Sequence, residues 1–96
     1  LVTKRGRVIA EIPAHVANVK NLTLCTVIGD DAGVTISTVE HLLAALRGLA
    51  IDNCYIEIDS KEVPIMDGSS CDFVEAIDRV GIRELAEPRK FIKVLK

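Results

Sequence analysis

The chain has 96 residues and a formal net charge of −2, with 49% hydrophobic and 27% charged residues. This is ordinary globular composition, and the length suits one small domain. The slight negative charge and the scarcity of aromatic residues, one Tyr and two Phe, argue against a nucleic-acid-binding surface. No apolar run is long enough for a transmembrane helix. The chain starts at Leu1 rather than Met and has no signal peptide, so we expect an internal piece of a longer protein.

The cysteines indicate a reducing compartment. Cys25, Cys54 and Cys71 are an odd number, widely spaced and without a C-x-x-C pair. This pattern argues against a disulfide framework and favours the cytosol. The simplest interpretation is three small buried side chains. A nucleophilic role for Cys25 would need a His–Asp pair, and the sequence offers none.

The first third of the chain predicts short strands. Residues 7–12 have the pattern of a strand that stops at Pro13, and residues 22–28 form a second run rich in β-branched side chains. A Gly- and Asp-rich turn cluster at 29–33 separates that run from residues 34–36. This spacing predicts a hairpin.

A helix is predicted next. Apolar side chains recur at i, i+3, i+4, i+7 and i+10, which places them on one face: Val39, Leu42, Leu43, Leu46 and Leu49. Ser37 and Glu40 fit a capping box, with Ser37 as N-cap and Glu40 three residues on. Gly48 helps to end the helix.

The rest of the chain predicts strand, helix and strand. Residues 52–59 alternate between two faces, which is typical of a strand. A second helix is expected over residues 70–80, with Ser69 and Asp72 as its capping pair. Its apolar face would carry Phe73, Val74, Ile77 and Val80. Residues 91–95 predict a last short strand. The fold class is therefore α+β, a two-layer domain with one mixed or antiparallel sheet packed on two helices.

The candidate chemistry lies in the first turn of the first helix. Glu40 and His41 flank its apolar stripe, about 100° apart around the helix axis, so both reach a cleft beside the core. The positive potential of a helix N-terminus keeps an imidazole neutral, the form that binds a metal, and favours an ionised carboxylate. A carboxylate beside a metal is placed to take a proton from an attacking water.

Structural interpretations of the same residues stay open at this point. Glu40 has a role in the capping box, and His41 has the position of a partly buried helix residue. A catalytic zinc takes three protein ligands, yet the only other histidine is His15. Neither histidine is followed by Asp or His four residues later, so the other ligands must come from elsewhere. Asp67, followed by Gly68, is placed either at the rim of a cleft or in a simple turn.

Several blocks together resemble one family. The sequences STVEHLLAAL at 37–46, IDN at 51–53 and EVPIMDGS at 62–69 have the order and spacing of the UDP-3-O-acyl-N-acetylglucosamine deacetylases. LCT at 24–26 and IPA at 12–14 are also similar to that family. The resemblance covers most of the chain, and the blocks together are specific.

The resemblance implies a zinc-dependent hydrolase. Such enzymes remove the N-acetyl group of UDP-3-O-acyl-N-acetylglucosamine during lipid A synthesis, in the cytoplasm of Gram-negative bacteria and possibly at the inner membrane surface. By family position Glu40 is the general base, His41 is a ligand of Zn²⁺, and Cys25 lies by the substrate at the active-site mouth. The family fold is two similar α+β domains packed face to face, with the site between them.

The chain departs from the family pattern by what it omits. The glycine-rich opening block and the other two zinc ligands, a His and an Asp four apart, belong to segments that this sequence does not contain. Residues 1–96 are therefore expected to be a partial first domain whose partner is the second domain of the same enzyme. The alternative is a catalytically incomplete remnant that acts as a partner-binding α+β module.

Overall fold

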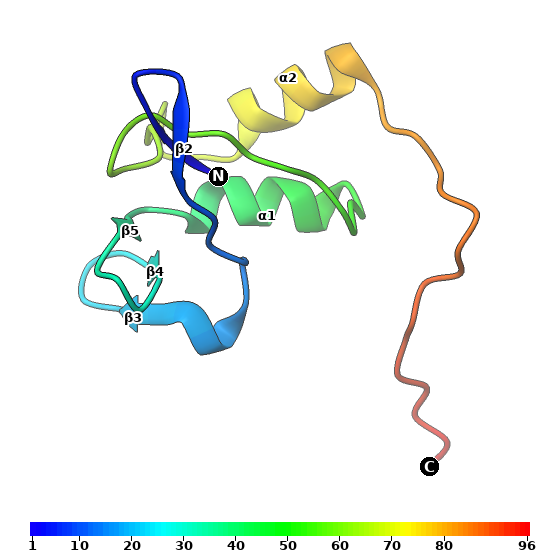
Figure 1. Ribbon diagram of the computed structural model, residues 1–96. Coiled ribbons are helices and arrows are strands. Elements are labelled where there is room, and N and C mark those ends of the chain that lie inside the picture. The colour runs from blue at the N-terminus through cyan, green and yellow to red at the C-terminus, as the bar shows by residue number, and fades with distance from the viewer.

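A computed structural model describes residues 1–96. Along the chain (Figure 1) the elements are β1 Val2–Lys4, β2 Arg7–Ala10, the 3₁₀ helix η1 Val16–Asn18, β3 Val19–Asn21, β4 Val27–Gly29, β5 Thr35–Ile36, α1 Glu40–Gly48 and α2 Cys71–Val80. The chain is α+β, as predicted, but its strands form two small antiparallel sheets instead of one. Neither helix is long and apolar enough to cross a membrane.

The first sheet is the β1–β2 hairpin. Arg5 and Gly6 connect its strands, and both have positive φ, as a type I′ turn requires. The sequence predicted β2 but not the very short β1. β1 is also held by a distant segment, because the Thr3 N–H donates to the Ile58 carbonyl at 2.8 Å and the Ile58 N–H donates to the Leu1 carbonyl at 2.9 Å.

The second sheet has the order β3-β4-β5. Only residues 27–28 of the strand predicted at 22–28 belong to it, whereas the predicted hairpin into residues 34–36 is confirmed as β4 and β5. Gly29 is buried where these two strands come together. An added Cβ there would lie 2.9 Å from the Thr35 Cγ2 atom and 2.9 Å from the Val34 carbonyl oxygen. The close approach of β5 to β4 therefore depends on glycine.

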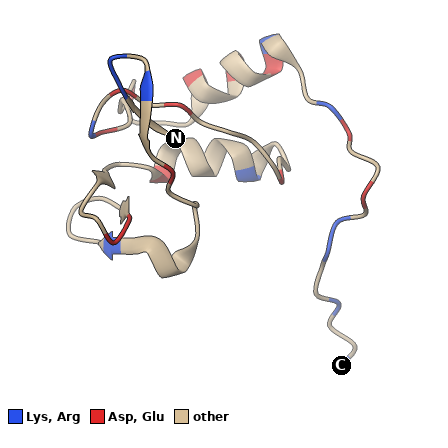
Figure 2. Cartoon of the chain, in the orientation of Figure 1, with Lys and Arg blue, Asp and Glu red and all other residues tan.

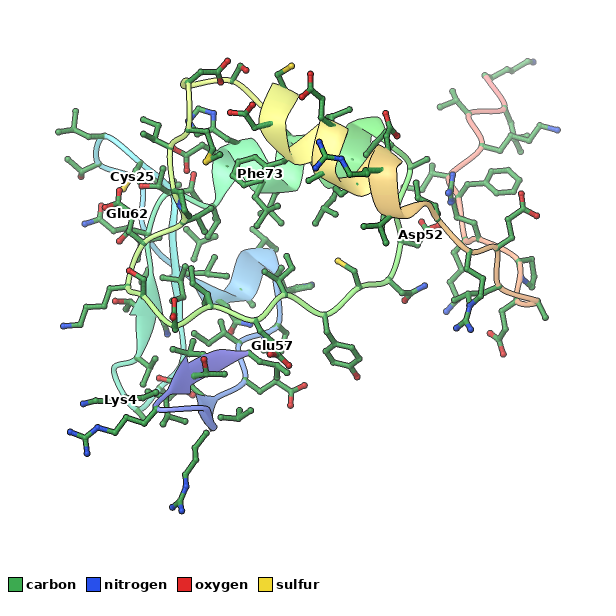
Figure 3. All side chains as sticks on the ribbon, turned by 90° about the horizontal axis from the view of Figure 1, so that it is seen from above. Lys4, Cys25, Asp52, Glu57, Glu62 and Phe73 are labelled. Carbon is green, nitrogen blue, oxygen red and sulfur yellow. The ribbon has the colours of Figure 1, made fainter.

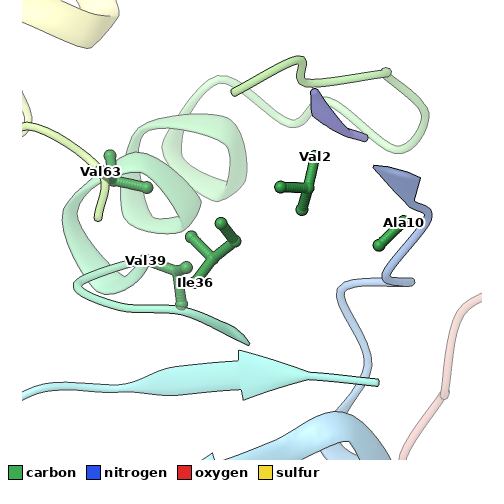
Figure 4. Close-up of a cluster of buried hydrophobic side chains, with 5 residues drawn as sticks. All are labelled: Val2, Ala10, Ile36, Val39 and Val63. Carbon is green, nitrogen blue, oxygen red and sulfur yellow. The ribbon is translucent and has the colours of Figure 1, made fainter. Parts of the chain in front are cut away.

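Both predicted helices are present, and they pack on each other. The first part of the α1 stripe faces the core, since Leu42 and Leu43 pack against it. Five buried side chains form this core: Val2, Ala10, Ile36, Val39 and Val63 (Figure 4). These residues come from β1, β2, β5, the start of α1 and the chain before α2. Side chains from both sheets therefore pack together at the N-terminal end of α1.

Two predicted strands are wrong. Residues 52–59 form no strand, since only Ile58 makes a β-bridge, with Val2. Residues 91–95 are also not a strand, and their apolar side chains, including Phe91 and Ile92, are exposed. Alternating side chains satisfy the pattern of a strand, but the backbone hydrogen bonds need a neighbouring strand. Residues 52–59 have one only at Ile58, which pairs with β1, and residues 91–95 have none.

After α2 the chain runs extended and exposed along one side of the molecule (Figure 1). Figure 2 shows that acidic and basic residues both occur along this segment. Arg89 attaches it to the body: its Nε and Nη2 atoms lie 3.0 and 2.8 Å from Asp52 Oδ2, and Nη2 also donates to the Ala50 carbonyl. The attachment point is just beyond the C-terminal end of α1.

An open apolar groove of about 580 Å³ lies between α1, residues 51–56 and the end of α2. Leu42 and Leu46 line it from α1, and Ile77 and Val80 line it from α2. Val80 is 88% exposed, so the predicted apolar face of α2 is only partly covered. Eight of the 96 residues are buried, and much of the chain's apolar surface is therefore open.

Candidate active site

Glu40 begins α1, but the predicted capping box does not form. The N-cap position is Val39, and no side chain caps the helix. The Glu40 Oε2 atom instead accepts a hydrogen bond of 3.1 Å from the Thr26 N–H. Ser37 lies two residues before the N-cap, and its backbone pairs with Lys61 and Val63 in a parallel bridge. Tertiary contacts have thus replaced a local motif.

The second carboxylate oxygen of Glu40 faces His41. Glu40 Oε1 lies 4.0 Å from His41 Nε2, an ion pair only when the imidazole is protonated. The side chains are partly open to solvent, 27% exposed for His41 and 36% for Glu40. The two residues therefore present an imidazole nitrogen and a carboxylate oxygen side by side.

The turn before α2 packs against the first turn of α1. The Ser70 hydroxyl donates to the His41 carbonyl at 2.7 Å, which fixes the backbone of the histidine. The Asp67 carboxylate accepts from the Ser69 hydroxyl at 2.7 Å and from the Ser69 N–H at 2.9 Å. These two hydrogen bonds lower the pKa of Asp67, and the nearby His41 adds a smaller effect in the same direction.

This turn also shows how far the sequence prediction of the α2 cap holds. Gly68 has a positive φ of 85°, as the predicted turn requires. The N-cap of α2 is Ser70, which makes no side-chain capping bond, whereas the Ser69 hydroxyl accepts from the Cys71 N–H at 3.1 Å at the start of the helix. Asp72 takes no part in it, so the predicted Ser69–Asp72 pair is wrong. Asp67 is the carboxylate that Ser69 binds.

Cys25 lies in the bend between β3 and β4, next to Thr26. Its thiol is free and partly buried. In the view of Figure 3, Cys25 and Glu62 lie at one end of the molecule and Asp52 at the other. Cys25 directly precedes Thr26, whose N–H binds the Glu40 carboxylate. Cys54 and Cys71 are exposed, which contradicts the expectation of three buried thiols.

The remaining candidate, His15, is apart from this site. It caps η1, and its Nδ1 atom accepts from the Ala17 N–H at 3.1 Å. No three His, Cys, Asp or Glu side chains converge as a metal-binding group. The residues that sequence patterns missed are Thr26, which binds Glu40 of α1, and Glu62, which binds Thr38 just before α1. Only the LCT and EVPIMDGS blocks point to those residues.

These features define a small α+β chain that presents a glutamate–histidine pair at the start of a helix. The sequence profile of the UDP-3-O-acyl N-acetylglycosamine deacetylases (LpxC) matches residues 2–96. The chain therefore belongs to this family, and the recognition made from its motifs is confirmed.

Individual relatives agree with this assignment. The chain is 54% identical over 86 residues, 90% of its length, to a UDP-3-O-acyl-N-acetylglucosamine deacetylase of Shewanella piezotolerans. It is 51% identical over 85 residues, 88% of its length, to the protein of that name from Shewanella frigidimarina. The chain spans 28% of the length of each of these relatives.

Proposed function

We propose that this chain contributes a general base and one zinc ligand to an enzyme that removes the N-acetyl group of UDP-3-O-acyl-N-acetylglucosamine in lipid A synthesis. The observation that carries the proposal is the Glu40–His41 pair. It is partly exposed at the start of α1, within a chain of this deacetylase family. Relatives that bear the enzyme's name match about nine-tenths of the chain.

The chain would be a partial first domain, and a second, similar α+β domain would be its partner in a face-to-face sandwich. The 28% span of the relatives' length supports this arrangement. The open groove along α1 and α2 supports it too, because large exposed apolar surfaces mark contact sites. We place the enzyme in the cytoplasm of a Gram-negative bacterium, at the inner membrane surface. Three free thiols suit that reducing compartment.

The residues present fit part of a zinc site. His41 offers a partly exposed imidazole, the usual nitrogen ligand of zinc, and Glu40 stands beside it as a carboxylate. A catalytic zinc takes three protein ligands, so two more would have to come from the partner domain. When bound, zinc supplies Lewis acidity, which activates water and polarises a carbonyl.

Glu40 would take the proton from the water that attacks the acetyl carbonyl. A carbon–oxygen bond then forms, the carbon–nitrogen bond breaks, and the amine leaves with a proton, which gives acetate and a free amino sugar. Of the two carboxylate oxygens, Oε1 is the one free to act, because Oε2 already accepts from the Thr26 N–H. That hydrogen bond orients the carboxylate, and the Ser70 hydroxyl holds the backbone of His41.

The test is Glu40→Ala in the complete protein that contains this chain. Loss of a general base is expected to lower kcat by about 10²- to 10⁴-fold while zinc content stays unchanged. Asp72→Asn is the matched control, because it also removes a carboxylate from the first turn of a helix. Acetate release and zinc content are measured for both variants. A Glu40→Ala enzyme with the wild-type rate would exclude Glu40 as the base.

For Cys25 we propose a place beside the substrate, at the mouth of the site. Its partly buried thiol adjoins Thr26, the residue that binds Glu40. Substrate should therefore slow alkylation of Cys25 in the complete protein, while the exposed Cys54 reacts at an unchanged rate. Equal protection of both thiols, or of neither, would remove Cys25 from the substrate site.

The alternative function is a catalytically incomplete module that only binds a partner. The exposed apolar side chains favour it, since Leu24 is fully exposed and the groove between the helices is open. Isolated, the chain should then bind a hydrophobic dye and associate with itself or with its partner. A strictly monomeric chain that ignores the dye would count against this function. Measured deacetylation by the complete protein would rule it out.

A further inference from the structure

The residue two before α1 has an unusual backbone. Thr38 has a φ of 61°, in the left-handed region that β-branched residues rarely adopt. It is also the one buried polar residue of the chain, at 5% exposure. Strain of this kind persists only where the surrounding contacts fix it, and it concentrates at functional sites. The contacts that fix Thr38 are therefore candidates for a functional role.

Those contacts come from the segment before α2. The Thr38 hydroxyl donates a short hydrogen bond, 2.6 Å, to the Glu62 Oε1 atom. The backbone on both sides of Glu62 pairs with Ser37: the Ser37 N–H donates to the Lys61 carbonyl at 2.9 Å, and the Val63 N–H donates to the Ser37 carbonyl at 3.0 Å. Glu62 itself is an exposed residue, so its carboxylate is held at the edge of the fold.

The strained turn leads directly to the candidate base. Val39 follows Thr38, and its N–H donates to the Thr26 carbonyl at 3.4 Å. The Thr26 N–H in turn donates to Glu40 Oε2 at 3.1 Å. Thr26 thus contacts the chain at both residues after the turn. The left-handed turn at Thr38 therefore directly precedes the two residues that contact Thr26.

We propose that Thr38 and Glu62 are a pair of positioning residues, whose hydrogen bond holds the turn that aims the Glu40 carboxylate. This inference rests on the proposed function of Glu40, but its structural part does not. The hydroxyl of Thr38 fixes the turn, the turn fixes Val39, and Val39 brings Glu40 to the Thr26 N–H. Misplacement of a catalytic group by about 1 Å lowers a rate by roughly 10²-fold.

The experiment uses Thr38→Val in the complete protein, which removes the hydroxyl and keeps a β-branched side chain. We expect kcat to fall roughly ten- to a hundredfold with KM and zinc content retained. Hydrogen exchange of the Thr26 amide should become faster, because the Glu40 carboxylate no longer holds its position as the hydrogen-bond acceptor. Thr38→Ser retains the hydroxyl, so its kcat and its Thr26 amide exchange rate should match those of the wild type. Glu57→Ala, which removes an exposed carboxylate five residues before Glu62, should change neither.

Glu62→Ala removes the same Thr38–Glu62 hydrogen bond by changing the exposed partner, so it disturbs folding less. It should lower kcat as Thr38→Val does, and the double variant should lose no more than either single one, since one hydrogen bond is removed in each case. Losses that multiply in the double variant would overturn the pairing. A Thr38→Val enzyme that melts earlier, yet keeps its kcat and its Thr26 exchange rate, would reduce the pair to a purely stabilising role.

The outcomes also separate this inference from the proposed function. If Glu40→Ala abolishes activity and the Thr38 and Glu62 variants leave it intact, only the positioning role fails. If Glu40→Ala leaves activity intact, the assignment of the base fails. Faster exchange at Thr26 in the Thr38→Val variant would still establish that the turn holds this contact.

Discussion

The Glu40 carboxylate accepts its hydrogen bond from the backbone of Thr26, fourteen residues earlier in the chain. One carboxylate oxygen is fixed by this contact, while the other lies 4.0 Å from His41 Nε2. A side chain that local sequence would assign to helix capping is thus held at the helix start by the β3–β4 bend. The site is therefore sensitive to changes in segments remote from α1.

His41→Ala in the complete protein should weaken zinc binding by more than about tenfold, because a direct ligand contributes at least as much as the groups that orient it. Zinc retained after dialysis against a competing chelator measures the effect. His15→Ala is the matched control, since His15 is exposed and caps η1 away from the pair. Wild-type zinc affinity in the His41 variant would remove His41 from the ligand set.

Gly29→Ala should destabilise the chain by about 1–3 kcal/mol, the usual cost of overpacking a close contact. The new Cβ would meet the Val34 carbonyl oxygen at 2.9 Å, and a backbone atom moves less easily than a side chain. Gly48→Ala is the control, because nothing lies within 4 Å of its Cβ position and alanine favours the helix by about 0.5–1 kcal/mol. Urea unfolding should show a lower free energy of unfolding for Gly29→Ala and a higher one for Gly48→Ala.

Ser69→Ala should raise the pKa of Asp67 towards its ordinary value, because the side-chain hydrogen bond that lowers it most is lost. Since the pKa in the folded chain lies below the reference of 3.8, this group adds stability above that value and loses it as the pH falls through the folded pKa. The carboxyl carbon titration, followed by NMR, measures the shift. Ser60→Ala, in an exposed turn, should leave the Asp67 titration unchanged.

Glu75→Gln should make the Cys71 thiol more reactive. The charge of Glu75 and its hydrogen bond with the thiol raise the pKa of Cys71, which lowers the thiolate fraction near neutral pH. Removal of that charge should speed alkylation of Cys71, measured by mass spectrometry of its peptide. Glu84→Gln, outside α2, is the control. An unchanged alkylation rate in the Glu75 variant would contradict the electrostatic explanation.

The parts of the fold that the sequence predicted, which are the two helices, β2 and the β4–β5 hairpin, make their backbone hydrogen bonds within one short stretch of chain. Both helices follow from apolar spacing, because their hydrogen bonds are internal. A strand depends on its neighbour. Residues 91–95 alternate well but have none, and the three-residue β1 exists only because β2 and Ile58 pair with it.

The same distinction applies to the site. The adjacency of Glu40 and His41 is a property of the sequence itself, so it was predicted. The N-cap role of Ser37 was wrong, because that residue is held by the segment at 61–63 instead. No periodic pattern relates Thr26 to Glu40 or Thr38 to Glu62, since these contacts join segments that meet only in the folded chain.

The pairing of β1 with Ile58 also affects the order in which contacts form during folding. Leu1 and Thr3 bond to Ile58, about 55 positions later, so a chain emerging from a ribosome cannot close this contact until Ile58 has been made. The β1–β2 hairpin and α1 need only local contacts and are free to form earlier, whereas the long loop closes late at an entropic cost. Residues 1–3 are thus expected to reach their final positions later than the hairpin turn that follows them and later than α1.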